Sequence, residues 1–200
     1  MVADQTGRGR APAATRVRLR WLAIVVAVMA VLTAGWPLLN TAVANRQALA
    51  SGAKVTIGSG HASSGTVTVG RGWYVQPEQS NPAVLYILRK SAVALYIRHV
   101  SLANRQPLQS MWTGMRQVLA VTLPGASLGA PLTIRTIHGL GAITGTVSDA
   151  RLVGTATIIP GPSRKFAIAM VVLAPRHTRL ALRSAARQVV LSLNFPKPSR

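Results

Sequence analysis

Cysteine is absent from the 200 residues, and acidic residues are scarce. Without cysteine the chain has no disulfide bond, no thiolate nucleophile and no cysteine-based metal site, and it is compatible with an oxidising compartment. The three acids are Asp4, Glu78 and Asp149. Glu78 and Asp149 stand in turn-like sequences, so they do not indicate the paired carboxylates of a glycosidase or an aspartic protease. The four histidines lack metal-ligand spacing, and we expect no cofactor.

The scarcity of acids leaves the chain strongly basic. The sequence has 23 lysines and arginines against its three acids, a net charge of +20. Five arginines and one acid precede residue 45, so 18 basic and two acidic residues remain after it, a net of +16. Such a charge favours anionic partners. Aromatic residues make up only 4% of the sequence and fall at core positions, so nucleic acid, which needs aromatics interleaved with charge, is not an expected partner.

One long uncharged run lies near the N-terminus. No charged residue occurs from Trp21 to Leu39, and as a helix this run would span about 28 Å, close to the hydrocarbon thickness of a bilayer. Five arginines precede the run, whereas only Arg46 and Lys54 follow it closely, so the positive-inside rule places the N-terminus in the cytoplasm. We therefore expect a basic cytoplasmic arm over residues 1–20 and a transmembrane signal anchor over 21–39. The protein would be a single-pass protein of the cell membrane, with its C-terminal domain extracytoplasmic.

A cleaved signal peptide is the alternative. The sequence Ala42-Val43-Ala44 fits the A-x-A pattern of signal peptidase sites, and cleavage after Ala44 would release a secreted protein. The length of the apolar run and the tryptophans Trp21 and Trp36, which are placed like interface anchors, favour the membrane anchor.

The remainder of the chain has the length of one domain. Residues 40–52 are predicted to form a helical stalk that ends at Gly52. Residues 53–200 are predicted to form an extracytoplasmic α+β domain, an antiparallel β-sheet with two packed amphipathic helices. Alternating apolar residues and Gly or Pro boundaries predict strands at 54–57, 66–69, 73–75, 84–90, 92–100, 132–138, 141–147, 152–159 and 166–173.

Helical periodicity occurs twice within this domain. The first helix is predicted from Gln106 to Leu119, with its apolar face toward the sheet and Pro124-Gly125 preventing its continuation. The second is predicted from about Thr178 to Leu193. Opposite its apolar side stands a row of cations, which is the candidate site for anionic lipid headgroups or cell-envelope polymers: Arg176, Arg179, Arg183 and Arg187. The row is also compatible with an ordinary solvated helix face.

One segment matches a catalytic motif in form. Gly125-Ala-Ser127-Leu-Gly129 fits the G-x-S-x-G pattern of serine hydrolases, which places the serine on a sharp turn from a strand into a helix. Here the predicted order is helix, turn, strand. A triad would also need a carboxylate, and the only acid downstream is Asp149. The pattern therefore favours a turn, and we expect no enzyme activity, with a hydrolase using Ser127 as the alternative.

The order of these elements resembles a known fold. Strands ending near Gly72-Trp73, paired strands, a helix from Pro107, four antiparallel strands and a closing amphipathic helix that leads into Asn194-Phe195-Pro196 resemble the Mog1/PsbP-like fold. Small actinobacterial envelope proteins, including the LpqN-type lipoproteins, are similar in outline, although this chain lacks their lipobox cysteine. The resemblance covers residues 54–196, and it implies a binding or accessory module without a known catalytic site.

The sequence thus predicts a membrane-tethered extracytoplasmic binding or accessory protein with a cationic surface. Its partners would be the membrane, anionic headgroups or envelope polymers, or another protein. A structural subunit of a membrane complex remains a further alternative.

Overall fold

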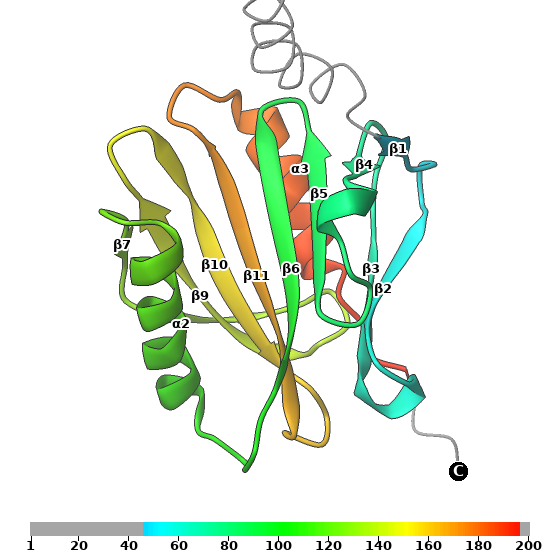
Figure 1. The fold of residues 1–200 in the computed structure, drawn as a ribbon, viewed down its shortest axis with the longest axis vertical. Helices are drawn as coiled ribbons and strands as arrows, with labels where there is room; N and C mark the ends of the chain where they lie inside the picture. The colour runs from blue at the N-terminus through cyan, green and yellow to red at the C-terminus, as the bar shows by residue number, and fades with distance from the viewer. Residues whose placement is uncertain (1–45, 197–200) are drawn as a thin grey trace, which may run out of the picture. The chain divides into compact units, whose positions relative to one another are not determined.

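One antiparallel sheet organises residues 46–196, the part of the chain that the computed structural model describes (Figure 1). Its strands follow the order β1-β4-β5-β6-β11-β10-β9-β7, and β8 pairs with β9 as well. The strands of this sheet are β1 (Gln47–Ala48), β4 (Tyr74–Val75), β5 (Leu85–Lys90), β6 (Val93–Ser101), β7 (Ser127–Leu128), β8 (Leu132–Arg135), β9 (Gly141–Ser148), β10 (Leu152–Pro160) and β11 (Phe166–Pro175).

The central strand β11 is apolar on both sides because both sheet faces carry packed elements. Along β11, Phe166, Ile168 and Met170 point to one face, and Ala167 and Val171 point to the other. This period of two is the ordinary geometry of a strand, and it sends every second side chain to each of two separate cores.

Helix α2 (Leu108–Thr122) covers one face over β9 and β10, and short strand β7 follows it. Its apolar side is anchored by Trp112, which is 1% exposed. The indole ring lies over Gly145 of β9, where a Cβ atom would come within 2.7 Å of the ring. A side chain at position 145 would therefore push the helix away from the sheet.

The opposite face carries helix α3 (Leu180–Leu191) and the hairpin of β2 (Lys54–Gly58) and β3 (Ser64–Thr68). Two single-turn 3-10 helices, η1 (His61–Ser63) and η2 (Pro77–Gln79), complete the elements. The hydroxyl of Ser192 accepts a hydrogen bond from the amide of Thr68 at 2.9 Å, which ties the end of α3 to β3. Fully buried Leu193 packs beneath this junction.

Each face of the sheet is consequently covered over only part of its width. Helix α2 lies over β9 and β10 and leaves β5, β6 and β11 open on its own face, as Figure 1 shows. Helix α3 with the β2–β3 hairpin covers the β6 and β11 side of the other face and leaves part of β9 and β10 open. Two grooves result, one beside each helix.

The predicted α+β class, with a large antiparallel sheet and two amphipathic helices, is confirmed. Nine of the observed strands overlap the nine predicted ranges, and both helices lie where the periodicity placed them, although α2 runs on to Thr122 and α3 ends at Leu191. The helical stalk is wrong for its described part, residues 46–52, because β1 forms there and pairs with β4. Gln47 opposes Val75 in this pairing, so the segment joins the sheet edge.

The basic arm and the predicted anchor at 21–39 lie outside the described residues. Among residues 46–196, no helix has the length and apolarity needed to cross a membrane.

Candidate functional site

One groove lies beside α3, and we call it the α3 groove. It has a volume of about 750 Å³, and its floor is the uncovered part of β9, β10 and β11. Its wall is the side of α3 that carries two of the candidate arginines. The polar residues lining it are Thr144, Thr155, Thr157, Arg183, Ser184 and Arg187, and Ile134, Val153, Val172, Ala174 and Val190 are among the apolar ones.

Threonines gather on this floor because β9 and β10 present alternate residues to it. Thr144 of β9 stands opposite Thr157 of β10, and their hydroxyl oxygens are 2.9 Å apart. The Thr144 hydroxyl also donates to the carbonyl oxygen of Ala156 at 3.0 Å. Thr155, in contrast, is exposed, as is Ser184 on the facing helix. The groove thus combines exposed hydroxyl groups with an apolar base.

Arg187 and Arg183 supply the positive charge, in different ways. Arg187 is exposed and lines the groove from the middle of α3. Arg183 is half-buried, and its guanidinium donates to the carbonyl oxygens of Pro175, the last residue of β11, and of Arg176, which follows it. Its Nε atom is buried and has no hydrogen-bond partner among the described residues. Arg183 therefore fixes the helix to the strand end while it places a cation at the groove.

Arg176 and Arg179 stand elsewhere, so the four candidate arginines do not form one helix stripe. Arg179 precedes the first turn of α3, where its carbonyl oxygen accepts a hydrogen bond from Leu182, and its side chain is exposed. Arg176 lies in the connection from β11 to α3. Its Nε and Nη2 atoms donate to the carbonyl oxygen of Asp149 at 3.2 and 2.6 Å. Its role there is to hold the β9–β10 turn.

Asp149 belongs to this turn rather than to a site. Its Oδ1 atom accepts hydrogen bonds from the amides of Arg151 and Leu152, each at 2.6 Å. These bonds, that of Leu152 first, lower the pKa of the carboxyl group below its ordinary value, and the nearby charges of Arg176 and Arg151 add to them. The carboxylate therefore stabilises a tight turn between two strands.

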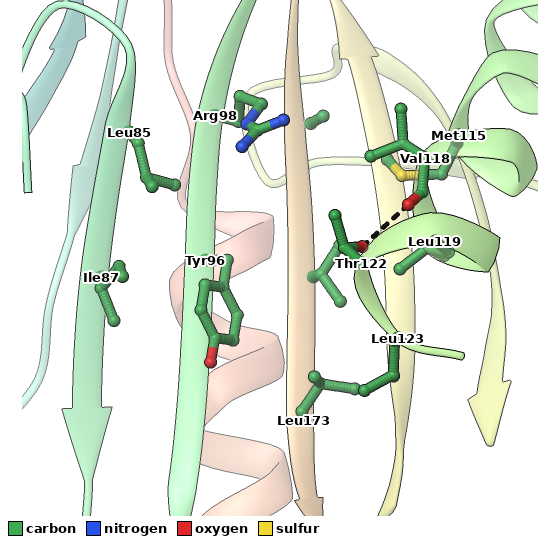
Figure 2. A pocket seen from close by; sticks show the side chains of 12 residues that line it. Leu85, Ile87, Tyr96, Arg98, Met115, Val118, Leu119, Thr122, Leu123 and Leu173 are labelled. Atoms are coloured by element: carbon green, nitrogen blue, oxygen red, sulfur yellow. Dashed lines mark hydrogen bonds between the residues drawn. The ribbon is translucent and has the colours of Figure 1, made fainter. Parts of the chain in front are cut away.

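A second groove, the α2 groove, lies on the other face between α2 and strands β5, β6 and β11 (Figure 2). One section has a volume of about 300 Å³, and a second, toward the start of α2, has about 530 Å³. Both sections are lined by Arg98, Met115, Val118 and Ala169, so they are continuous. The first section is otherwise lined mainly by apolar side chains, which include Leu85, Ile87, Tyr96, Leu119, Val171 and Leu173.

The sequence does not predict the α2 groove, although it contains part of the pattern that forms it. In the predicted strand 92–100, Tyr96 and Arg98 alternate with buried Leu95 and Ile97, which marks the face that α2 does not cover. The spacing predicts which residues share that face. It does not predict that α2 stops short of them.

Ser127 does not stand on a nucleophile turn. It lies in β7, paired with Ser148 of β9, and its hydroxyl group is 3.0 Å from the Ser148 Oγ atom and 3.2 Å from the Ser148 carbonyl oxygen. Among the described residues, no histidine is hydrogen-bonded to it. The G-x-S-x-G match therefore follows a turn and a short strand, as the order of elements favoured.

Comparison with known proteins bears on the fold. No protein-family model matches the chain, and no curated protein matches it either. Among solved structures, cyanobacterial PsbP (CyanoP) from Synechocystis is similar with a TM-score of 0.53 and 11% identity, over 74% of this chain and 95% of that one. The Ran-binding protein Mog1p of Saccharomyces cerevisiae is similar with a TM-score of 0.50 and 12% identity, over 72% of this chain and 96% of that one.

These similarities confirm the predicted Mog1/PsbP-like resemblance at the level of the fold. The identities are too low to transfer a site, and similarity to LpqN-type lipoproteins stays a prediction. The described domain of this chain therefore has the Mog1/PsbP-like fold.

Proposed function

We propose that this chain is a non-catalytic, membrane-tethered binding protein whose α3 groove holds an anionic, hydroxyl-rich polymer of the cell envelope. The observation that carries the proposal is the placement of Arg183 and Arg187 beside the exposed hydroxyls of Thr155 and Ser184 in the α3 groove. Guanidinium groups form charge-assisted hydrogen bonds with phosphate and carboxylate, and hydroxyls pair with sugar or polyol hydroxyls.

The charge of the domain supports an anionic ligand. Of the two acids in the described residues, Glu78 does not line the groove, and the Asp149 carboxylate is held by its own turn. Arg179 is exposed next to the start of α3 and extends the positive field beyond the groove. The tether is supported by the apolar run at 21–39 and the arginines before it, which would place the groove on the envelope side of the membrane.

A binding role is also compatible with the fold comparisons. Mog1p is named a Ran-binding protein, so a fold of this kind serves binding in that protein. The hydroxyl of Ser127, the one residue with a catalytic motif, is paired with Ser148.

The test is a binding measurement with the full chain in phosphatidylcholine nanodiscs. Three labelled polymers serve as probes: polygalacturonate, which has charge and hydroxyls, polyphosphate, which has charge alone, and dextran, which has hydroxyls alone. Polygalacturonate is expected to bind most tightly. Arg187→Gln removes one exposed contact worth about 1 kcal/mol, which is about a fivefold loss of affinity.

Arg116→Gln is the matched control, because Arg116 is also exposed on a helix but lies on α2, on the other face. It should change the affinity less than twofold. Equal losses from the two variants would contradict a localised site and indicate binding through net charge. If phosphatidylserine vesicles bind more tightly than polygalacturonate with the same dependence on Arg187, the ligand is a lipid headgroup and the polymer proposal is wrong.

A further inference from the structure

The α2 groove is wide enough to hold one further α-helix beside α2. Neighbouring strands lie about 4.8 Å apart, so β11, β6 and β5 together span about 10 Å, which is the diameter of an α-helix with its side chains. Helix α2 already occupies the neighbouring strands β9 and β10 on this face. A second helix lying beside α2 would complete the layer.

The length and chemistry of the groove agree with such a helix. Its lining extends from Ser110 to Leu123, which is almost the whole of α2. The first section is lined almost wholly by apolar side chains, and Val118, which lines both sections, is 44% exposed. The second section also carries polar side chains, those of His99, Ser101, Gln106, Ser110 and Gln117. In the first section, the hydroxyl that α2 contributes is that of Thr122, which donates to the carbonyl oxygen of Val118 at 2.8 Å and is thereby used within α2 (Figure 2).

Arg98 indicates that the occupant of the groove carries a negative charge. It is exposed on β6 and lines both sections of the groove, and Figure 2 shows it on the groove floor above Tyr96. Within residues 46–196 its guanidinium has no hydrogen-bond partner, and neither Glu78 nor Asp149 lines the groove. A mainly apolar surface with one unneutralised cation is complementary to an amphipathic helix whose apolar face is bordered by a carboxylate.

Neither of the described α-helices has this chemistry. The sequences of α2 and α3 contain no acid, and the only acid before residue 45 is Asp4 in an arginine-rich stretch. A second copy would also bring another net charge of +20. We propose that the α2 groove binds an acidic amphipathic helix of a different protein, with the helix apolar face on β5, β6 and β11 and a carboxylate on Arg98.

The test selects ligands from a phage-displayed library of peptides about four helical turns long, with an apolar stripe at helical spacing and all other positions randomised. The target is the full chain in phosphatidylcholine nanodiscs, with empty nanodiscs removing lipid binders. Enriched peptides are expected to carry Asp or Glu beside the stripe and to become helical on binding. Failure to enrich peptides over empty nanodiscs, or enrichment of basic or proline-rich ones, would overturn the proposal.

Two matched pairs of variants locate the binding. Val118→Glu places a charge in the groove and should weaken the best peptide at least tenfold. Val121→Glu is its control, because Val121 lies on the same helix, is 80% exposed and does not line the groove. Arg98→Glu should likewise cost at least tenfold, against less than twofold for Arg187→Glu on the other face.

Equal effects within either pair would contradict the proposed site. If dansylundecanoate, a fluorescent fatty acid, binds more tightly than every selected peptide and is expelled by Val118→Glu, the groove takes an amphiphile and the helix proposal is wrong. The proposed polymer binding does not depend on this groove, and Arg187→Glu distinguishes the two sites.

Discussion

The contact between Trp112 and Gly145 gives the sharpest prediction about the fold, because it seats α2 on the sheet and thereby sets one wall of the α2 groove. In Gly145→Ala the new Cβ atom would lie 2.7 Å from the Trp112 Cζ2 atom and 3.0 Å from the carbonyl oxygen of Ala130. Trp112 is 1% exposed, so its ring is enclosed by neighbouring atoms. Overpacking of this kind costs about 1–3 kcal/mol of unfolding free energy.

Gly114→Ala is the matched control with the opposite sign. Gly114 lies in the middle of α2, and no atom stands within 4 Å of the position its Cβ would take. Alanine is favoured over glycine in a helix interior by about 0.5–1 kcal/mol, so this variant should be more stable than the parent chain.

Pulse proteolysis of the full chain across a urea series measures both effects, because only unfolded domain is cleaved during the pulse. The urea midpoint should fall for Gly145→Ala and rise for Gly114→Ala. An unchanged or raised midpoint for Gly145→Ala would refute the close approach of Trp112 to β9 and, with it, the position of the groove wall.

Three further predictions concern other parts of the chain. The folded-state pKa of Asp149 is lowered, so its carboxylate stabilises the fold above the ordinary value of 3.8 and loses that contribution as the pH falls through the lowered pKa. The urea midpoint of Asp149→Asn should therefore lie below that of the parent at pH 6 and converge with it in strong acid; a constant offset would contradict this cause. Ser127→Ala should change stability by less than about 0.5 kcal/mol, since its hydroxyl is exposed, and labelling of the parent chain by a fluorophosphonate probe would revive the hydrolase alternative. Intact mass of the mature protein should include residues 1–44, whereas their loss would replace the tether with secretion.

The sequence predicts most of the helices and strands because the strand period of two residues and the helix period of 3.6 residues are both clear in it. Apolar residues in β11 alternate over ten positions, and those of α2 recur at helical spacing from Leu108 to Leu119. Strand β1 was not predicted. Two residues are too few to show a period, and the helix-forming sequence around Arg46 is overridden by pairing with β4.

The sequence identifies the arginines of the candidate site but not their arrangement in the structure. A helical wheel places the four arginines together only when the helix is continued back to Arg176, two residues before its predicted start at Thr178. The structure begins α3 at Leu180, because the Arg176 guanidinium is used by the Asp149 carbonyl and the connection must turn back from β11. Arg183 is drawn toward the end of β11 by two carbonyl oxygens that no sequence pattern reveals.

The grooves follow from the order of strands, which periodicity leaves open. Strand β6 lies beside β11, where Tyr96 opposes Val171, although these residues are far apart in the chain. That pairing builds the floor of the α2 groove. The threonines of the α3 groove likewise meet only because β9 and β10 pair with Thr144 opposite Thr157.

Amide hydrogen exchange of the full chain in nanodiscs, with and without polygalacturonate, tests the proposed function most directly. We expect the polymer to slow exchange in α3 and in the facing strands β9 and β10, and to leave α2 and β5 unchanged. In Arg187→Gln the protection should decrease at the same polymer concentration. Protection that spreads evenly over the basic surface, or that falls on α2, would contradict the α3 groove as the binding site.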